Sequence, residues 1–154
     1  GPVPASLENE LASNHVDWES YSDLTTDEVY GLYKSCDIVA FVSTYEGFGM
    51  PVVEAQWVER PVVASNCSAM PEVAGRGACF VDPLDPASIR TGLLRVIHDR
   101  DFRAELIDFG RQNRMRFQLG EVAKQYQDLY AAVLAREKLP LELTADLAEP
   151  PPTV

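Results

Sequence analysis

The sequence predicts an α/β fold, specifically part of a Rossmann-like, doubly wound parallel sheet with closing helices. Three short apolar runs, at residues 38–42, 61–64 and 78–81, have the length of strands. A continuous apolar run is typical of a strand buried on both faces, as in a parallel sheet. Helical patterns separate these runs, and alternation of strand and helix indicates βαβ units.

The first part of the chain is acidic and polar. Residues 1–15 contain two prolines and fit an irregular segment or a frayed helix. A short strand is plausible at Val16-Asp17-Trp18. Thr25 and Glu28 have the spacing of a capping box, which predicts that a helix begins there. Apolar residues then recur at i, i+3, i+4 and i+7, as on one face of a helix: Val29, Leu32, Tyr33 and Cys36.

Helices are expected after each of the three apolar runs. Pro51 suits the first position of a helix that ends near Glu59, and a short helix fits the chain from Pro71 to Gly75. Asp85 followed by proline predicts a capped helix start. Two further helices fit residues 101–117 and 121–137, and the Pro-rich acidic tail 138–154 is expected to be extended or disordered.

The number of strands is low for a complete domain of this class. A doubly wound sheet usually contains about five or six strands, whereas the sequence offers three clear ones and one weak one. We therefore interpret residues 1–137 as a partial Rossmann-like domain, whose first strands are expected in a longer parent protein.

Composition excludes several classes of function. The net charge of −11 argues against nucleic-acid binding, which requires clustered Lys and Arg. We find neither a signal-peptide pattern nor an apolar stretch near the roughly 20 residues that a membrane span needs. The three cysteines are far apart in sequence and suit reduced thiols in a cytoplasmic protein: Cys36, Cys67 and Cys79.

The segment after the first apolar run has the features of a ligand site. It lies at the carboxyl end of a buried parallel strand, where open α/β sheets bind ligands. Gly47 and Gly49 would let the backbone approach a ligand closely. No side chain before Pro51 can cap the helix, so the N–H groups of Val52 and Val53 are expected to point outward as an anion site.

Two carboxylates flank this segment. Glu46 precedes the helix, and Glu54 lies in its first turns, so both can face one cleft together with Gly49. Paired carboxylates accept hydrogen bonds from vicinal hydroxyls of sugars and riboses. Glu54 alone could merely complement the helix dipole, and Glu46 alone could be a solvated loop residue. The joint pattern after a buried strand favours a binding site.

The same segment resembles the signature of family 4 of the glycosyltransferases, two glutamates separated by seven residues with an E-G-F-G start at Glu46. The resemblance extends over roughly residues 16–137, including Leu32 to Asp37, Arg60 to Ser65, Met70 to Val73 and Val81 to Pro83. The family usually has glycine where Arg60 stands. The family has the two-Rossmann-domain architecture called GT-B, and this chain resembles the C-terminal part, the donor-binding domain.

The resemblance implies a retaining glycosyltransferase that uses a nucleotide-diphosphate sugar, without a cofactor or a catalytic metal. Glu46 would hold hydroxyls of the donor sugar and act as the catalytic residue. The backbone at Gly47, Phe48, Gly49 and Met50 would contact the sugar and the β-phosphate, together with the N–H groups of Val52 and Val53. Glu54 would bind ribose hydroxyls, and the loop at Tyr21 and Ser22 would hold the base. Consistent with the expected absence of a metal, His15 and His98 stand isolated in the sequence.

The resemblance also implies which parts a complete enzyme would add. A strand, a Gly-Arg-type turn and a Lys normally open the donor domain and neutralise the diphosphate, and an N-terminal acceptor domain precedes it. Without that cationic stabilisation we expect this chain alone to be inactive. The acceptor would be a glycan or glycolipid, as in polysaccharide biosynthesis. The parent would then be cytoplasmic, with peripheral association at the inner face of the membrane.

Two alternatives remain open from the sequence. A glycoside hydrolase could use Glu46 and Glu54 as its paired carboxylates, but the free helix N-terminus would then have no role. A non-catalytic fragment could bind nucleotide or self-associate, because an unpaired strand edge invites an edge-strand dimer.

Overall fold

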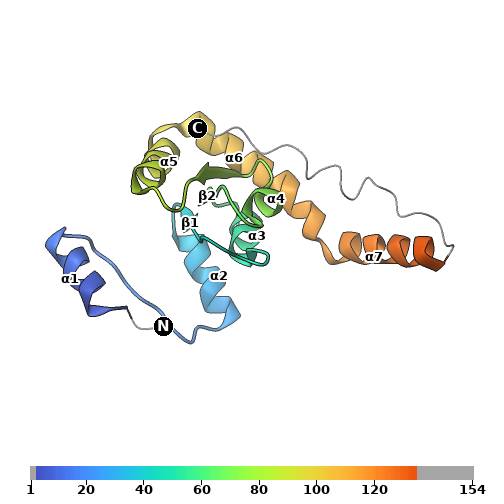
Figure 1. Cartoon of the computed structure of the whole chain (residues 1–154), viewed down its shortest axis with the longest axis horizontal. Helices are drawn as coiled ribbons and strands as arrows, with labels where there is room; N and C mark the ends of the chain where they lie inside the picture. Colours follow the sequence, from blue (N-terminus) through green and yellow to red (C-terminus); the bar gives the residue numbers. More distant parts are fainter. Residues whose placement is uncertain (1–2, 135–154) are drawn as a thin grey trace. The chain divides into compact units, whose positions relative to one another are not determined.

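The computed structural model describes residues 3–134 (Figure 1). The chain divides into two compact units, one up to Leu32 and the other from Tyr33 onward. The tail predicted for residues 138–154 lies outside the described residues.

The first unit contains helix α1, Ala5–Ser13, and most of helix α2, Thr26–Ser35. The helical alternative for residues 1–15 is therefore correct. The predicted capping box is present: the Thr25 N–H and hydroxyl both donate to Glu28 Oε2, at 2.8 and 2.7 Å. In return the Glu28 N–H donates to Thr25 Oγ1 at 3.4 Å. This hydrogen bonding lowers the pKa of Glu28, because the bonds favour the ionised carboxylate.

The strand expected at Val16-Asp17-Trp18 is wrong. Residues 16–22 have no regular secondary structure, and Val16 and Trp18 are 47% and 39% exposed. A three-residue strand has to pair with a neighbour to be stable, since its main-chain groups form no bonds within the strand. The apolar-polar-apolar alternation of Val16, Asp17 and Trp18 is too short to indicate that a neighbouring strand is present.

The second unit contains a three-stranded sheet in the order β1-β2-β3, with β1 at Val39–Phe41, β2 at Val62–Ser65 and β3 at Ala78–Val81. Both neighbouring pairs are parallel. In register, Ala40 lies opposite Val63, which in turn lies opposite Cys79. The three clear strands and their parallel pairing are as predicted.

Helices cover both faces of this sheet. Helices α3, Met50–Trp57, and α4, Met70–Ala74, pack on one face and share a core with the side chains of Val62 and Ala64. Helices α5, Pro86–His98, and α6, Arg100–Asn113, bring Val96 and Leu106 onto the other face. Burial there raises the pKa of the Cys79 thiol, an effect that Arg95 partly offsets. The sheet is thus covered as a doubly wound fold requires.

Aspartate side chains cap two of these helices. Asp85 accepts a hydrogen bond from the Ala87 N–H, and Asp99 accepts one from the Phe102 N–H, both at 2.9 Å. The helix predicted for residues 101–117 ends as α6 at Asn113, and a 3-10 turn, η1, follows over Arg114–Phe117. Helix α7 occupies Leu119–Leu134 in the described chain.

The C-terminal end of α3 is closed by main-chain bonds. The Arg60 N–H donates to Ala55 O at 2.9 Å and the Glu59 N–H to Gln56 O at 3.2 Å, which is the Schellman arrangement. Its left-handed residue is Glu59, with φ of 60°. Glycine usually occupies such a position. The backbone of this helix end therefore favours glycine at Glu59. The position where the family usually has glycine, Arg60, is the next residue along the chain.

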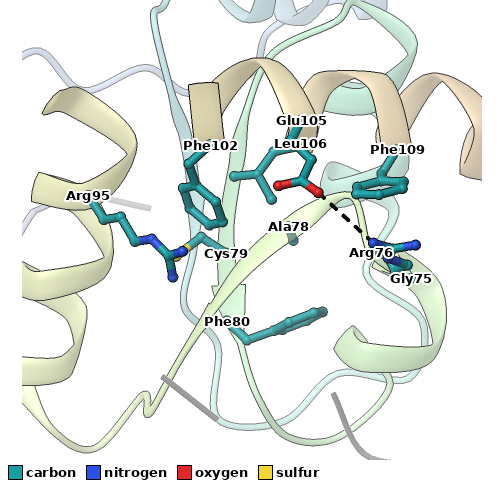
Figure 2. A pocket seen from close by; sticks show the side chains of 10 residues that line it. All are labelled: Gly75, Arg76, Ala78, Cys79, Phe80, Arg95, Phe102, Glu105, Leu106 and Phe109. Carbon is teal, nitrogen blue, oxygen red and sulfur yellow. Dashed lines mark ion pairs between the residues drawn. The ribbon is translucent and has the colours of Figure 1, made fainter. Parts of the chain in front are cut away.

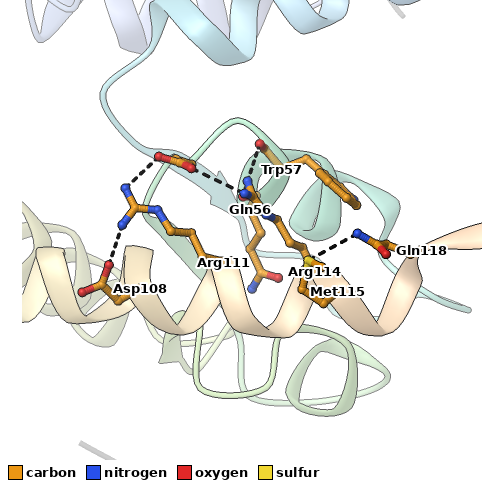
Figure 3. A network of polar contacts seen from close by, with 8 residues as sticks. Gln56, Trp57, Asp108, Arg111, Arg114, Met115 and Gln118 are labelled. Carbon is orange, nitrogen blue, oxygen red and sulfur yellow. Dashed lines mark hydrogen bonds and ion pairs between the residues drawn. The ribbon is translucent and has the colours of Figure 1, made fainter. Parts of the chain in front are cut away.

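Side chains around this helix end join α3 to α6 and η1 (Figure 3). Arg111 donates to Glu59 Oε2 at 2.8 Å and to Asp108 Oδ1 at 2.7 Å. Arg114 donates to the Trp57 carbonyl oxygen at 2.8 Å. These bonds fix the end of α3 that lies away from the predicted ligand site. Over residues 3–134, no helix is both long and apolar enough to cross a bilayer.

Candidate functional site

The loop between β1 and α3, residues 42–49, is attached to the loop that follows β2. Ser65 Oγ, at the end of β2, donates to the Ser43 carbonyl oxygen. The Cys67 thiol lies 3.6 Å from the Thr44 carbonyl oxygen. Because parallel strands end at the same edge of a sheet, these contacts place both loops together at the carboxyl end of the sheet.

Ser68 holds the main chain of Glu46. Its hydroxyl donates to the Glu46 carbonyl oxygen at 2.7 Å and accepts from the Glu46 N–H at 3.1 Å. Ser68 has a φ of 58°, a left-handed conformation that costs free energy for a residue with a Cβ. The two bonds offset that strain and fix where the Glu46 side chain starts. The half-buried Glu46 is therefore a loop residue with a well-defined backbone.

Gly49 is required by the fold at the start of α3. Its φ is 97°, and a Cβ built there would lie 2.5 Å from Met70 Cε and 2.9 Å from Met70 Sδ. Neither the backbone conformation nor the space admits a larger residue without rearrangement. Gly49 is buried and therefore has a structural role. The role predicted from the sequence, to let a ligand approach the main chain, stays a prediction.

Gly47 presents the opposite situation. A Cβ at Gly47 would meet nothing within 4 Å, and the residue is exposed. The packing of the described chain therefore gives no reason for glycine at this position. Open space beside an exposed backbone is what a ligand approaching the main chain would use, although that use stays a prediction.

The N-terminus of α3 is only partly as predicted. Gly49 is the N-cap, with no side-chain cap bond, and Pro51 lies in the first turn. The prediction that the Val52 N–H is unpaired is wrong, because this N–H donates to the Gly49 carbonyl oxygen at 3.0 Å. This bond joins residues three apart, as in a 3-10 turn, so the first turn of α3 is tightened. The outward-facing N–H of Val53 stays a prediction.

Glu54 is half-buried, and its Oε2 accepts a hydrogen bond from the Tyr33 hydroxyl at 3.0 Å. Tyr33 lies in the last turns of α2, twenty-one residues earlier in the sequence. The carboxylate thus pairs with a neutral hydroxyl that orients it and leaves its negative charge in place. Its second oxygen has the chemistry to accept hydroxyl hydrogen bonds from a ligand.

Exposed apolar side chains surround the loop. Tyr45, Phe48 and Met50 are 81%, 42% and 54% exposed. The Phe48 ring packs edge-to-face on Phe117 of η1, with 5.6 Å between ring centroids. Aromatic and thioether groups on an accessible loop provide surface on which a sugar ring or an apolar acceptor could rest.

Tyr21 and Ser22 belong to the first compact unit. Tyr21 is 51% exposed, and its hydroxyl donates to the Glu19 carboxylate. This bond and the negative charge of Glu19 raise the pKa of the Tyr21 phenol. The role of both residues in holding a base stays a prediction. Among the residues that the structure describes, no three His, Cys, Asp or Glu side chains gather as ligands for a metal ion.

A family model described as "Glycosyl transferases group 1" matches residues 4–113 of the chain. The chain belongs to the group 1 glycosyl transferases. The resemblance identified from the Glu46 motif is thereby confirmed.

Curated relatives support the assignment over part of their length. The chain is 34% identical over 119 residues to the MMP alpha-(1->4)-mannosyltransferase of Mycolicibacterium hassiacum, covering 75% of this chain and 29% of that protein. It is 29% identical over 109 residues to the D-inositol 3-phosphate glycosyltransferase of Corynebacterium urealyticum, covering 70% and 26%. The chain thus spans between a quarter and a third of the length of these two relatives.

Solved structures share the fold. Sucrose-phosphate synthase from Thermosynechococcus elongatus superimposes with a TM-score of 0.69 at 20% identity, over 85% of this chain and 34% of that one. Anabaena HepE, solved in complex with UDP, gives a TM-score of 0.69 at 21% identity, over 82% and 36%. The C-terminal domain of a group 1 glycosyl transferase from Francisella tularensis gives 0.64 at 24%, over 74% and 62%. The chain thus has the fold of part of a GT-B glycosyltransferase, with the parallel sheet as predicted.

Sequence reasoning missed three residues that shape this site. Ser68 binds the Glu46 main chain, Tyr33 binds the Glu54 carboxylate, and Phe117 packs on Phe48. Each lies more than twenty residues from its partner in sequence, so no local pattern could indicate the contact. The positive φ of Ser68 indicates a constrained loop residue, but a φ angle cannot be read from the sequence.

Proposed function

We propose that this chain forms the donor-binding part of a retaining glycosyltransferase that transfers a hexose from a nucleotide-diphosphate sugar to a glycan or glycolipid acceptor. The observation that supports this most is the Glu46 loop. Its backbone is fixed by Ser68 at the carboxyl end of the sheet, beside a helix N-terminus with no side-chain cap. That combination offers a carboxylate for sugar hydroxyls next to main-chain N–H groups for phosphate.

The roles of the residues follow their positions along the loop. Glu46 would hold donor hydroxyls and stabilise positive charge that develops at the anomeric carbon. Gly47 would let the main chain approach the donor, with Phe48 and Met50 beside the sugar. Val53 and the dipole of α3 would face the β-phosphate. Glu54, oriented by Tyr33, would accept hydrogen bonds from the ribose hydroxyls.

Relatives guide the choice of donor and acceptor. Several curated relatives are mannosyltransferases, including O-antigen chain mannosyltransferase B of Escherichia coli, 36% identical over 87 residues. We infer a hexose donor carried on UDP or GDP, and an acceptor from surface-polysaccharide or glycolipid synthesis. The parent enzyme would act in the cytoplasm, at the inner face of the membrane, and it would need no catalytic metal.

We expect this chain by itself to bind nucleotide weakly and to transfer no sugar. The N-terminus of α3 supplies only about half a positive charge toward a diphosphate. The chain's net charge of −11 opposes the approach of an anion. The parent would supply the cationic groups that neutralise the leaving diphosphate.

Calorimetric and NMR titration of this chain with UDP and GDP tests the proposal. We expect a dissociation constant near the millimolar range, with amide shifts confined to the loop at 46–50 and the start of α3. Glu54→Ala should weaken binding about tenfold, the loss expected for a hydrogen bond to a charged group. Glu121→Ala removes an equal charge from an exposed site on α7 and should leave binding unchanged.

If Glu54→Ala leaves the nucleotide affinity unchanged, or if the amide shifts lie outside the loop and the start of α3, the proposed donor site is contradicted. Micromolar affinity would show that the diphosphate site is complete in this chain. In the longer parent, Glu46→Ala should mainly lower kcat and Glu54→Ala should mainly raise KM for the donor. NMR of the product's anomeric proton distinguishes retention from inversion.

A further inference from the structure

A groove of about 240 Å³ lies along β3, distant in sequence from the Glu46 loop and lined from a different set of elements (Figure 2). The residues that line it come from three places: the segment before β3 and β3 itself, the end of α5, and α6. Within the described part of the chain, β3 is the last strand of the sheet and pairs only with β2. The groove is therefore associated with a free strand edge.

The free edge presents main-chain groups. The Asn66 N–H donates to the Val81 carbonyl oxygen at 2.9 Å, so the main-chain groups of Val81 face β2. Along a strand, successive residues turn their N–H and C=O to opposite sides. The N–H and C=O of Phe80, one of the residues lining the groove, therefore face away from β2. Phe80 therefore offers a ligand one donor and one acceptor in fixed positions.

Two arginines flank the groove, each stacked on a phenylalanine of α6. The Arg95 guanidinium lies 3.7 Å from the centre of the Phe102 ring, and the Arg76 guanidinium lies 3.7 Å from the centre of the Phe109 ring. The two rings are seven residues apart on one helix, a rise of about 10 Å. Stacking engages the flat face of a guanidinium and leaves its N–H edge available for an anion.

The two arginines differ in their partners. Arg76 Nη2 lies 4.0 Å from Glu105 Oε1, with both side chains largely exposed. Arg95 is half-buried, and over residues 3–134 it makes neither an ion pair nor a side-chain hydrogen bond. The positive charge at the Arg95 end of the groove is thus uncompensated, whereas Glu105 partly neutralises the other end. In a chain with a net charge of −11, this is a local exception.

The floor between the arginines is apolar. Ala78, Cys79 and Leu106 line it and are buried. An apolar floor favours a hydrocarbon body, and a guanidinium with free N–H groups favours a carboxylate, which it can bind through two parallel hydrogen bonds. A volume of 240 Å³ is small for a nucleotide-diphosphate sugar.

We propose that the groove along β3 binds a small organic carboxylate with an apolar body, the carboxylate on Arg95 and the body on Ala78 and Leu106. This site is separate from the proposed donor site and does not depend on it. Because the ligand has few atoms, affinity in the millimolar range is expected.

Titration of the chain with 3-phenylpropionate, followed by amide NMR, tests the proposal. The uncharged isostere 3-phenylpropionamide is the matched ligand, because it keeps the apolar body and lacks the charge. The acid should shift the amides of Phe80, Cys79 and Leu106 and should bind about tenfold more tightly than the amide, since a charge-assisted bidentate pair is lost.

Three variants sharpen the test. Arg95→Gln should weaken binding of the acid about tenfold, to the level of the amide. Arg90→Gln removes the same charge from an exposed position on α5 and should have no effect. Glu105→Gln should strengthen binding severalfold, because it removes a repelling charge and frees Arg76.

Equal binding of the acid and the amide, equal weakening by Arg95→Gln and Arg90→Gln, or shifts outside the groove would each overturn the proposal. If Arg95→Gln does not fold, as judged by its amide spectrum, the opposite-sign effect of Glu105→Gln decides. Unchanged or weaker binding by Glu105→Gln would also overturn it.

Discussion

The two ends of α3 use polar groups in different ways. At its N-terminal end, Gly49 provides no side-chain cap, and the loop before it exposes Tyr45, Phe48 and Met50. At its C-terminal end, the helix closes with a Schellman arrangement, and buried side chains bind the main-chain carbonyls around it.

The buried bonds at the C-terminal end centre on Gln56, which is 2% exposed. Its Nε2 donates to Ala74 O at 3.0 Å and Gly77 O at 3.3 Å, and its Oε1 accepts from Asn113 Nδ2 at 2.8 Å. Asn113 Nδ2 also donates to Val73 O at 2.7 Å. In the described chain, Arg114 Nε is the buried side-chain atom left without a partner.

The difference separates stability from function within one helix. A buried polar group left without a partner costs free energy, so the C-terminal end satisfies nearly all of its groups internally. At the N-terminal end, the Glu46 carboxylate and the main chain at Gly47 remain accessible, and these groups contribute little to packing. The comparison predicts that substitutions of the buried groups at the C-terminal end change stability, and that substitutions of the accessible groups at the N-terminal end change binding.

The largest expected effect is on the C-terminal end. Gln56→Ala removes a buried side chain and its bonds to the Ala74 and Gly77 carbonyls and to the Asn113 amide. Of these groups, the Ala74 carbonyl keeps its bond from the Gly77 N–H and the Asn113 amide keeps its bond to Val73 O. We expect a loss of about 3 kcal/mol in the free energy of unfolding. Urea denaturation measures it, with the exposed Gln112→Ala on α6 as the control. A loss below about 1 kcal/mol would mean that water replaces the bonds.

Two glycines test the comparison at the N-terminal end of α3. Gly49→Ala forces a Cβ into a φ of 97° and within 2.5 Å of Met70 Cε, so we expect a loss of about 2 kcal/mol of stability. Gly47→Ala meets nothing within 4 Å and should alter stability by less than about 0.5 kcal/mol. If Gly47 serves the donor, Gly47→Ala should nevertheless weaken UDP or GDP binding. Unchanged nucleotide binding in Gly47→Ala would refute that role.

Ser68 offers a smaller effect that separates strain from hydrogen bonding. Ser68→Ala keeps the left-handed φ of 58° and loses both bonds to the Glu46 main chain, so about 1 kcal/mol of stability should be lost. Ser68→Gly also loses the bonds but relieves the strain, and its stability should lie closer to that of the unmodified chain.

Both Ser68 variants should shift the Glu46 amide resonance and broaden those of the loop at 43–49. If Ser68→Gly leaves the Glu46 amide unchanged, the serine hydroxyl does not position the loop. Thermal denaturation of both variants supplies the stability difference.

The sequence predicted those elements whose signals are local. The capping box at Thr25, the capped start of α5 at Asp85 and the three apolar strands are all present. The carboxyl-end loop followed from the position of Glu46 after a strand. The strand at 16–18 failed because pairing depends on a partner that three residues do not specify.

The features that the sequence could not predict depend on contacts between residues far apart in the chain and on local backbone conformation. Tyr33 and Glu54 are 21 residues apart, and Gln56 and Asn113 are 57 apart. The Val52 N–H is paired because the first turn of α3 closes with a bond between residues three apart, which no sequence pattern specifies.

The smallest expected effect concerns Glu59, at the Schellman position of α3. Glu59 Oε2 accepts from Arg111 at 2.8 Å, and Glu59 Oε1 lies 3.5 Å from Arg114 Nη2. The hydrogen bond from Arg111 is the main reason that the pKa of Glu59 lies below its ordinary value. Its carboxylate therefore adds stability above the pKa of the unfolded chain, and that stability is lost as pH falls through the folded-state pKa.

Glu59→Gln and Glu59→Gly together separate the charge from the backbone strain. Glu59→Gln should flatten the fall of stability with acidification, and the flattening should diminish in high salt because the pair is exposed. Glu59→Gly should flatten the pH dependence equally. At neutral pH it should be more stable than Glu59→Gln, since glycine adopts a φ of 60° without strain. Urea midpoints measured from neutral to acidic pH decide the matter. If Glu59→Gln leaves the pH profile unchanged, the ion pair contributes nothing to folding, and the C-terminal end of α3 is held by its main-chain bonds, the Gln56 network and the bond from Arg114 to the Trp57 carbonyl oxygen.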